Sequence, residues 1–203
     1  MPKEQRPSEA KRVNQDPLSK LAAAVQGGEA GSDHDILTGP DWITGRPPPP
    51  IECWDPDHCG DIGMEIRADG SWWHENAPIK RQKLVQLFAS ILRREADGLY
   101  YLVTPVEKVV VHVALHPLLV IDAEPLQGHT PETLILTLNT GGQIPLDANH
   151  PLALEPRAAH AAYVSLQHGL SALFSRAAWY RLAGLANDEG MIQSGGVRFS
   201  LLG

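Results

Sequence analysis

Cationic side chains gather at the start of one predicted helix. Lys80, Arg81 and Lys83 lie within four positions of one another, where positive charge opposes the helix dipole and calls for a compensating group. A phosphate or carboxylate would supply it, because free backbone N–H groups and an arginine fork both bind such anions. A solvated basic surface, or pairing of Arg81 with Glu75 or Glu107, explains the same residues without a ligand.

A second arginine occupies a comparable position later in the chain. Arg176 follows Phe174 as Arg81 follows Ile79, and large apolar residues recur at the same spacing after both. This pattern is typical of an internal duplication. We therefore expect Arg81 and Arg176 to face one ligand from two related halves.

Other side chains complete the candidate ligand-binding set. Trp72 and its neighbour Trp73 begin a predicted strand, so one points inward and the other outward, where it either stacks on a base or covers the core. Proline does not fit a regular ladder, so Thr104-Pro105 marks either a crossover between the halves or a simple edge-strand break. Glu107 and Lys108 are placed at the interface between the halves. The predicted ligand-binding residues are Arg81, Lys83, Arg176, Trp72, Thr104, Glu107 and Lys108.

Catalytic and metal chemistry have weaker signals. Glu95, Asp97 and Glu107 are candidate acids or bases, although Asp97 precedes Gly98 in a turn pattern and Glu95 suits a helix end. Cys53 and Cys59 have acidic and histidine neighbours, but their spacing is not that of a zinc site and no second Cys/His pair follows. No serine has a nucleophile-elbow context and no glycine-rich loop opens a helix. The sequence identifies no catalytic residue, metal or cofactor.

Composition limits the function classes. The chain has 203 residues, and its hydrophobic fraction of 43% is typical of a globular protein. Its formal net charge of −7 argues against general binding to nucleic acid or anionic membranes, which attract positively charged proteins. No apolar run reaches the roughly 18 residues that cross a bilayer, and the start lacks the apolar core of a signal peptide. We expect a cytoplasmic protein.

The elements that would position these residues follow from apolar spacing and turn signals. Residues 1–50 are interpreted as a polar tail with one short helix over 17–26 and a proline-rich linker, and we expect their deletion to change the unfolding midpoint little unless that helix docks. Helices are predicted over 79–94 and 171–186. Short β-rich runs separated by glycine and proline predict antiparallel meanders.

These elements predict an α+β fold of two related strand-turn-helix-strand repeats with largely antiparallel sheets. We place the first α+β half at 51–104 and the second half at 105–203.

The stretch from 59 to 108 resembles the bacterial family known as domain of unknown function 1285. Its pattern is met here by Cys59-Gly60-Asp61, Asp69-Gly70, Trp72, Pro78-Ile79, Arg81, Leu84-Val85, Leu87-Phe88, Glu95, Asp97-Gly98, Tyr100 and the run from Leu102 to Lys108. Asn139-Thr140, His150-Pro151, Gly169-Leu170 and Arg176 also fall where the family has them, so the resemblance covers roughly residues 50–201.

The resemblance implies a duplicated α+β core whose second half is similar to a pleckstrin-homology-like barrel. It also implies a nucleotide-like ligand site where the halves meet and a role in signalling, but no activity. Two segments depart from the family pattern: Ala114–Leu118 replaces an acidic segment, and Gln167–Ser171 replaces an Arg-x-Gly-Leu-Glu-like turn. If the missing charges bind a ligand in relatives, the part of the ligand site contributed by the second half binds more weakly here.

The leading functional hypothesis is therefore a cytoplasmic regulatory module that binds a small anionic, nucleotide-like ligand between its halves. One alternative is a small hydrolase or transferase using Glu95, Asp97 or Glu107. The other is a protein-interaction adaptor, by analogy with barrels that bind peptides.

Overall fold

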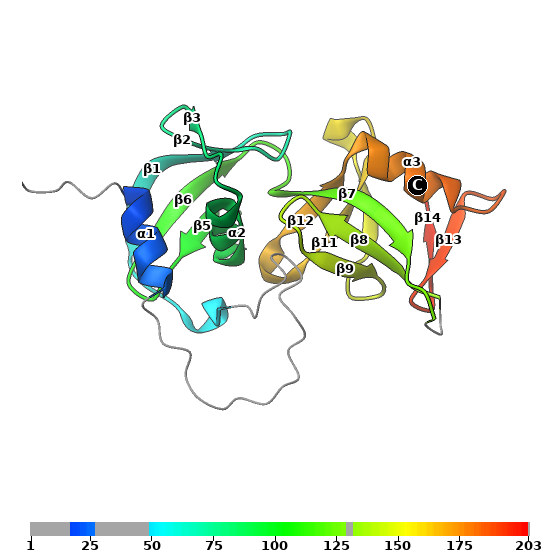
Figure 1. The fold of residues 1–203 in the computed structure, drawn as a ribbon, viewed down its shortest axis with the longest axis horizontal. Helices are drawn as coiled ribbons and strands as arrows, with labels where there is room; N and C mark the ends of the chain where they lie inside the picture. The colour runs from blue at the N-terminus through cyan, green and yellow to red at the C-terminus, as the bar shows by residue number, and fades with distance from the viewer. Residues whose placement is uncertain (1–16, 27–48, 129–131, 203) are drawn as a thin grey trace, which may run out of the picture.

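The computed structural model describes residues 17–26, 49–128 and 132–202. Two β-sheet halves lie side by side, each carrying one of the longer helices of the folded body (Figure 1). Both sheets are mixed, with one parallel pair among antiparallel neighbours. The α+β class and the division into two halves are thus confirmed.

The first half is a six-stranded sheet with the order β3-β2-β1-β6-β5-β4. Its central strands β1 and β6 run parallel, and helix α2 connects the two edge strands. The short 3₁₀ helix η1 (Ile51–Cys53) precedes it. The elements are β1 (His58–Ile66), β2 (Trp72–His74), β3 (Ala77–Pro78), α2 (Gln82–Ser90), β4 (Leu92–Arg94), β5 (Tyr100–Val103) and β6 (Lys108–Val113).

The second half has a six-stranded sheet with the order β10-β11-β12-β7-β8-β9, followed by a helix and a separate hairpin. Ser194 ties the hairpin to the sheet: its hydroxyl accepts from the Leu134 N–H and donates to the Leu146 carbonyl. The elements are β7 (Leu118–Pro125), β8 (Leu134–Leu138), β9 (Gln143–Leu146), β10 (Leu152–Glu155), η2 (Pro156–Ala158), β11 (Ala161–Ser165), η3 (Gln167–Gly169), β12 (Ser171–Phe174), α3 (Arg176–Gly184), β13 (Met191–Ser194) and β14 (Val197–Ser200).

The two sheets share one topology. Each consists of two three-stranded meanders. At the centre of the sheet, the first strand of the earlier meander pairs in parallel with the last strand of the later one: β1 with β6 in the first half, and β7 with β12 in the second. The helices are not equivalent: α2 follows the edge strand β3, whereas α3 follows the central strand β12. The two halves are therefore related by the order of their strands. This order does not support the predicted equivalence of Arg81 and Arg176, because the strands that precede them occupy different places in the two sheets.

Both predicted helices are shorter in the structure. The span 79–94 contains α2 (Gln82–Ser90) and then β4, in which Leu92 pairs with Leu102 of β5. The span 171–186 begins with β12, whose Leu173 pairs with Tyr163 of β11. Long-range strand pairing overrides a helical apolar period at each site, because propensity is a weak determinant beside tertiary burial.

The domain boundary lies later than predicted. Strand β6 (Lys108–Val113) pairs with both β1 and β5, so it belongs to the centre of the first sheet. Thr104-Pro105 is not a crossover but part of the tight turn between β5 and β6, closed by a 2.9 Å hydrogen bond from the Thr104 N–H to the Glu107 carbonyl. The passage between halves is the short segment 114–117.

Helix α1 (Pro17–Gln26) packs against α2 at the edge of the first half. Leu21 is only 1% exposed and joins the core, with Leu18 also buried and Val25 partly so. The apolar stripe at i, i+3 and i+7 is thus a docking face, so the exception stated for the dispensability of residues 1–50 applies to this segment.

The halves are joined by contacts from α2 and from the turn after β1. The amides of Gln82 and Gln86 donate to the Asn139 and Thr140 carbonyls in the β8–β9 turn, at 3.0 and 2.7 Å. A Cβ on Gly70 would lie 2.9 Å from atoms of Leu119 and Asn139. The turn of one half thus fits closely against the second sheet.

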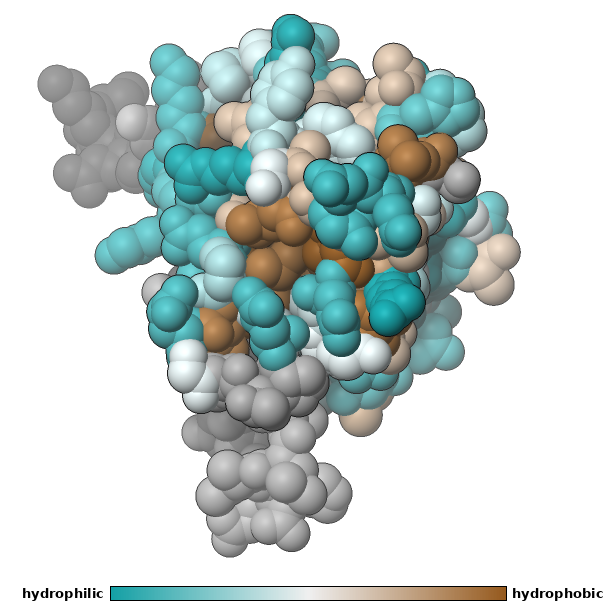
Figure 2. All heavy atoms as spheres, turned by 90° about the vertical axis from the view of Figure 1, so that its right-hand side faces the viewer, coloured by the Kyte–Doolittle hydropathy of each residue, from teal (hydrophilic) through white to brown (hydrophobic). Residues whose placement is uncertain are grey.

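The far end of the second half presents apolar side chains framed by hydrophilic ones (Figure 2). Ile121, Leu185 and Leu202 are among the exposed large apolar residues of this half. Within the described residues, no helix is long and apolar enough to cross a membrane.

Candidate functional site

A cleft of about 870 Å³ opens where the two halves meet. The first half contributes β6, the β2–β3 turn and the β4–β5 turn, and the second contributes β11, η3 and the ends of β10 and β12. Such a volume suits a small molecule of cofactor or nucleotide size.

Two arginines line this cleft from opposite halves, Arg94 at the end of β4 and Arg157 in η2. Arg94 is exposed; its Nε donates to the Gly98 carbonyl at 3.1 Å, and its guanidinium carbon lies 5.6 Å from the centre of the Tyr100 ring. Among the described residues, no carboxylate pairs with Arg94. It is therefore a cation with hydrogen-bonding capacity left for a ligand.

Arg157 is engaged by Glu155. Its Nε and Nη2 donate to the two Glu155 oxygens at 2.9 and 3.1 Å, and its backbone N–H donates to the same carboxylate. These hydrogen bonds lower the pKa of Glu155 to about 2. Glu155 is 8% exposed and remains an anion at neutral pH.

Two histidines also line the cleft. His112 Nε2 lies 2.7 Å from the Asp61 carboxylate, and this hydrogen bond lowers the pKa of Asp61. His116 lies in the segment between the halves, with Nδ1 at 2.7 Å from Ser171 Oγ and Nε2 at 3.1 Å from Glu155 Oε2. The cleft thus combines hydrogen-bonding, cationic and aromatic groups.

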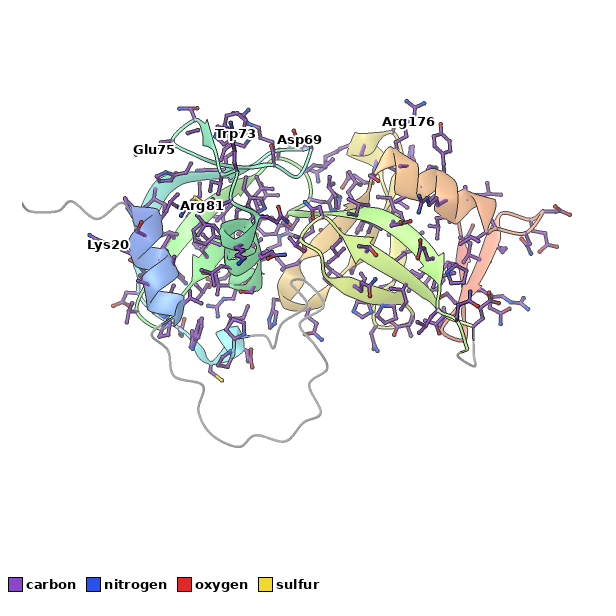
Figure 3. The ribbon with its side chains drawn as sticks, in the orientation of Figure 1. Lys20, Asp69, Trp73, Glu75, Arg81 and Arg176 are labelled. Carbon is purple, nitrogen blue, oxygen red and sulfur yellow. The ribbon has the colours of Figure 1, made fainter. Side chains whose placement is uncertain are left out.

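The predicted basic residues lie elsewhere. Arg81 occupies the N-cap position of α2 without a capping side-chain bond, Lys83 is exposed, and Arg176 opens α3 and donates to the Tyr180 hydroxyl at 3.3 Å. Figure 3 places Arg81 and Arg176 on different halves and well apart. The structure does not bring them to one ligand, and Arg81 forms no ion pair with Glu75 or Glu107 among the described residues.

The tryptophan pair divides as the strand pattern predicts. Trp72 is 2% exposed and stacks on Phe88 of α2, with ring centroids 6.3 Å apart. Trp73 points outward, and the Arg67 guanidinium carbon lies 3.4 Å from the centre of its ring. Trp72 is therefore a core residue and cannot stack on a ligand.

Thr104 and Glu107 form the β5–β6 turn. Thr104 is fully buried, and its hydroxyl accepts from the Glu107 N–H and donates to the Glu107 carbonyl, at 3.1 and 3.0 Å. The threonine thus has a local structural role outside the cleft.

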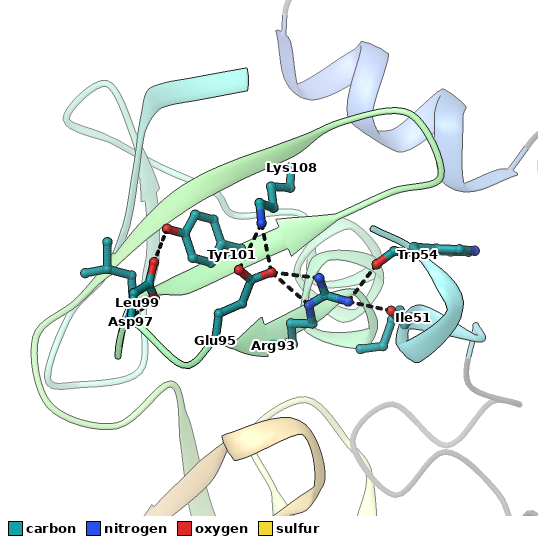
Figure 4. Close-up of polar contacts among 8 residues, drawn as sticks. All are labelled: Ile51, Trp54, Arg93, Glu95, Asp97, Leu99, Tyr101 and Lys108. Atoms are coloured by element: carbon teal, nitrogen blue, oxygen red, sulfur yellow. Dashed lines mark hydrogen bonds and ion pairs between the residues drawn. The ribbon is translucent and has the colours of Figure 1, made fainter. Parts of the chain in front are cut away.

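Lys108 belongs to a polar cluster centred on Glu95 (Figure 4). The Glu95 carboxylate accepts from Arg93 at 2.7 Å and from Lys108 at 2.9 Å, while Arg93 also donates to the Ile51 and Trp54 carbonyls. Burial opposes ionisation, but these two cations outweigh it and lower the pKa of Glu95. Glu95 is thus an ionised cross-link between β4, β6 and the start of the domain.

Asp97 is likewise engaged locally. It accepts from the Tyr101 hydroxyl at 2.7 Å and from the Leu99 N–H, and these bonds lower its pKa. The same contact raises the pKa of Tyr101 to about 12. In the described part of the chain, no group of three or more histidine, cysteine or acidic side chains could hold a metal ion.

The residues that the structure brings to the cleft, Arg94, Arg157, His116, Glu155 and Ser171, were missed by motif and spacing. His116 and Ser171 do lie in the two segments that depart from the family pattern, which was the one available signal. Their contact joins positions 55 residues apart, so no local periodicity could reveal it.

Comparison with known proteins gives a consistent result along the chain. Residues 49–114 match the N-terminal domain model of the domain of unknown function DUF1285, and residues 117–201 match its C-terminal domain model. These spans agree with a division after β6. No curated protein matches the chain.

Two solved structures are similar. A DUF1285 family protein from Silicibacter pomeroyi DSS-3 is 36% identical, with coverage of 75% of this chain and 86% of that chain and a TM-score of 0.68. Another from Shewanella baltica OS155 is 32% identical, with coverage of 62% and 94% and a TM-score of 0.51. The two consecutive domain matches and these structures establish that the chain belongs to the DUF1285 family.

Proposed function

We propose that this protein is a cytoplasmic regulatory module that binds a small anionic, nucleotide-like ligand in the cleft between its halves. The observation that carries the proposal is Arg94, an exposed arginine without a carboxylate partner among the described residues, at the wall of a cleft lined by both halves. A guanidinium offers a planar fork that matches phosphate and carboxylate oxygens.

The surroundings of Arg94 support this assignment. Tyr100 beside it and Tyr163 across the cleft offer aromatic faces on which a flat ring could stack. The cleft spans both halves, so a ligand would bridge them and stabilise their arrangement. A bridging ligand of this kind is how a two-domain module converts binding into a change of state.

Thermal-shift screening against nucleotides, inorganic phosphate and small carboxylates tests the proposal. A ligand at 100 times its Kd should add about 2.7 kcal/mol to the free energy of unfolding. Isothermal titration with a hit should then show that Arg94→Ala weakens binding roughly ten- to hundredfold, since a charge-assisted contact is lost. Arg94→Lys should recover little of it, because the ammonium lacks the planar fork.

Arg81→Ala and Arg176→Ala are matched controls on exposed arginines outside the cleft. We expect both to bind as the wild type does. If either of them abolishes binding while Arg94→Ala does not, the anion binds at a helix start, as the sequence alone suggested. If no member of the panel stabilises the protein, the cleft proposal fails.

A further inference from the structure

A serine, a histidine and a glutamate meet in the cleft from three separate elements. His116 comes from the segment between β6 and β7, Ser171 begins β12, and Glu155 ends β10. The imidazole lies between the other two, with Nδ1 at 2.7 Å from the serine oxygen and Nε2 at 3.1 Å from the carboxylate. All three line the cleft.

The hydrogen bonds set the direction of the proton chain. Glu155 is ionised and can only accept, so the His116 Nε2 must carry the proton that it accepts. The lone pair of Nδ1 then faces Ser171, and the hydroxyl donates to it. This is the arrangement of a nucleophile, a general base and a group that orients the base.

The environment of the imidazole keeps it neutral. Burial lowers the pKa of His116, and nearby Arg157 acts in the same direction, although the hydrogen bond and charge of Glu155 oppose them. The Tyr163 ring covers one face at 4.7 Å between centroids, and the imidazole is 6% exposed. A neutral imidazole at pH 7 is able to accept the serine proton.

We propose that Ser171 is a nucleophile, activated by His116 and Glu155, and that the cleft hydrolyses carboxylic esters carrying a negative charge near the reacting group. The serine and histidine define the reaction; the charge of the substrate rests on the proposed anion binding at Arg94. The imidazole is turned relative to the usual triad, with Nδ1 rather than Nε2 on the serine; in a neutral imidazole either ring nitrogen can be the acceptor while the other carries the proton.

The reaction balances with water as the only co-reactant. The Ser171 Oγ bonds to the ester carbonyl carbon as its proton passes to His116 Nδ1. The carbon–oxygen bond to the alcohol breaks, and the leaving oxygen takes that proton. A water molecule then attacks the acyl-serine, giving its proton to Nδ1, and the released Oγ recovers it, so that an acid and an alcohol are produced.

The same contacts have a structural alternative, in which His116 only anchors the segment between the halves. A fluorophosphonate probe separates the two, because it labels activated serines and its attachment is located by mass spectrometry of the full chain. Hydrolysis of p-nitrophenyl acetate and of the anionic p-nitrophenyl succinate gives a second readout.

We expect the probe to label wild-type protein at Ser171 and the wild type to hydrolyse both esters. Ser171→Ala should abolish labelling. His116→Gln should reduce the rate at which the probe labels Ser171 by about 100- to 10,000-fold, the usual contribution of a general base. Ser200→Ala is the matched control, since Ser200 is an exposed serine of β14 that does not line the cleft.

The pH profile is a signature that an anchoring role would not produce. The labelling rate should rise through one ionisation below pH 6.5, the ordinary pKa of histidine, and be constant above about pH 7. Glu155, Arg157, Tyr163 and Ser171 face the imidazole, and Glu155 stays charged throughout that range.

The outcomes separate this proposal from the anion-binding one. Absence of labelling in a folded wild type, or labelling that persists in Ser171→Ala, overturns the nucleophile, and anion-induced thermal shifts would then leave the binding function standing. Labelling at Ser171 without any anion-induced shift, and equal rates for both esters, supports the nucleophile and removes the charged substrate. A succinate preference lost in Arg94→Ala supports both.

Discussion

At the scale of single residues, the carboxylates predicted as candidate acids or bases at Glu95 and Asp97 form ion pairs or hydrogen bonds with neighbouring side chains. Glu95, a candidate acid or base from the sequence, accepts hydrogen bonds from Arg93 and Lys108, and Arg93 also donates to the carbonyls of Ile51 and Trp54. Its side chain is 21% exposed, so water screens these contacts only in part. The hydrolase or transferase reading based on Glu95, Asp97 or Glu107 stays a prediction, and the cleft offers different residues.

Replacing Glu95 by glutamine should lower the free energy of unfolding by about 1–2 kcal/mol at pH 7, because two cations lose a charged acceptor. The effect should depend on pH. The pKa of Glu95 is lowered in the fold, so its stabilisation is complete above the ordinary value of 4.5 and is lost as the pH falls through the folded value.

Urea unfolding at pH 7 and near pH 3.5 measures both effects, and the gap between wild type and variant should narrow in acid. Glu107→Gln provides the control, since Glu107 is used in its turn through backbone atoms, and should change stability by less than about 0.5 kcal/mol. An unchanged stability of Glu95→Gln at pH 7 would show that the cluster contributes nothing measurable.

At the scale of elements, α1 is the segment whose behaviour the tertiary structure changes most. A helix of ten residues is marginal in water by itself. Its apolar stripe is satisfied by docking on the first half, where Leu21 enters the core. The helix is thus part of the folded body despite the long stretch of chain between it and η1.

Leu21→Ala should lower the free energy of unfolding by about 2–4 kcal/mol, since it empties a buried leucine site. Lys20→Ala, on the exposed side of the same helix, should be nearly neutral. Thermal unfolding of the full chain measures both. Equal midpoints for the two variants would mean that α1 does not dock in solution.

At the scale of the whole molecule, two sheets of one topology are held together by a few close contacts beside the cleft. The turn at Gly70 fits against Leu119 and Asn139, and the Asn139 amide donates to the Gly70 carbonyl at 3.4 Å. On the opposite flank, a Cβ on Gly169 would lie 3.0 Å from the Arg94 Cβ. These contacts bring the two walls of the cleft together.

Gly70→Ala tests this close fit, with Gly128→Ala as a control of nearly the same φ angle. The two glycines have φ angles of +75° and +76°, but a Cβ at Gly128 meets nothing within 4 Å. Both variants should lose about 1–2 kcal/mol through backbone strain, and Gly70→Ala should lose about 1–3 kcal/mol more through overpacking. Chemical unfolding compares them; equal losses would indicate that the halves do not press together at this turn.

The sequence by itself determined the α+β class, the family, the presence of short strands in meanders and the inward placement of one tryptophan of the pair at 72 and 73. These follow from local periodicity and turn chemistry, which act within a few residues. Helix lengths and the domain boundary were decided by pairing partners far along the chain: Leu92 became strand because Leu102 lies beside it, and β6 joined the first sheet because β1 and β5 flank it.

Only the tertiary structure decided which side chains meet. No motif or spacing joins His116, Glu155 and Ser171, and the fold brings together the segment between β6 and β7, the end of β10 and the start of β12 beside one cleft. Arg81 and Arg176 show the opposite case. The sequences around them match, but the strands that precede them occupy different places in the two sheets, so the two arginines do not meet. The physical reason is that a one-dimensional pattern records which face of an element is buried, whereas a site depends on which elements are neighbours in space.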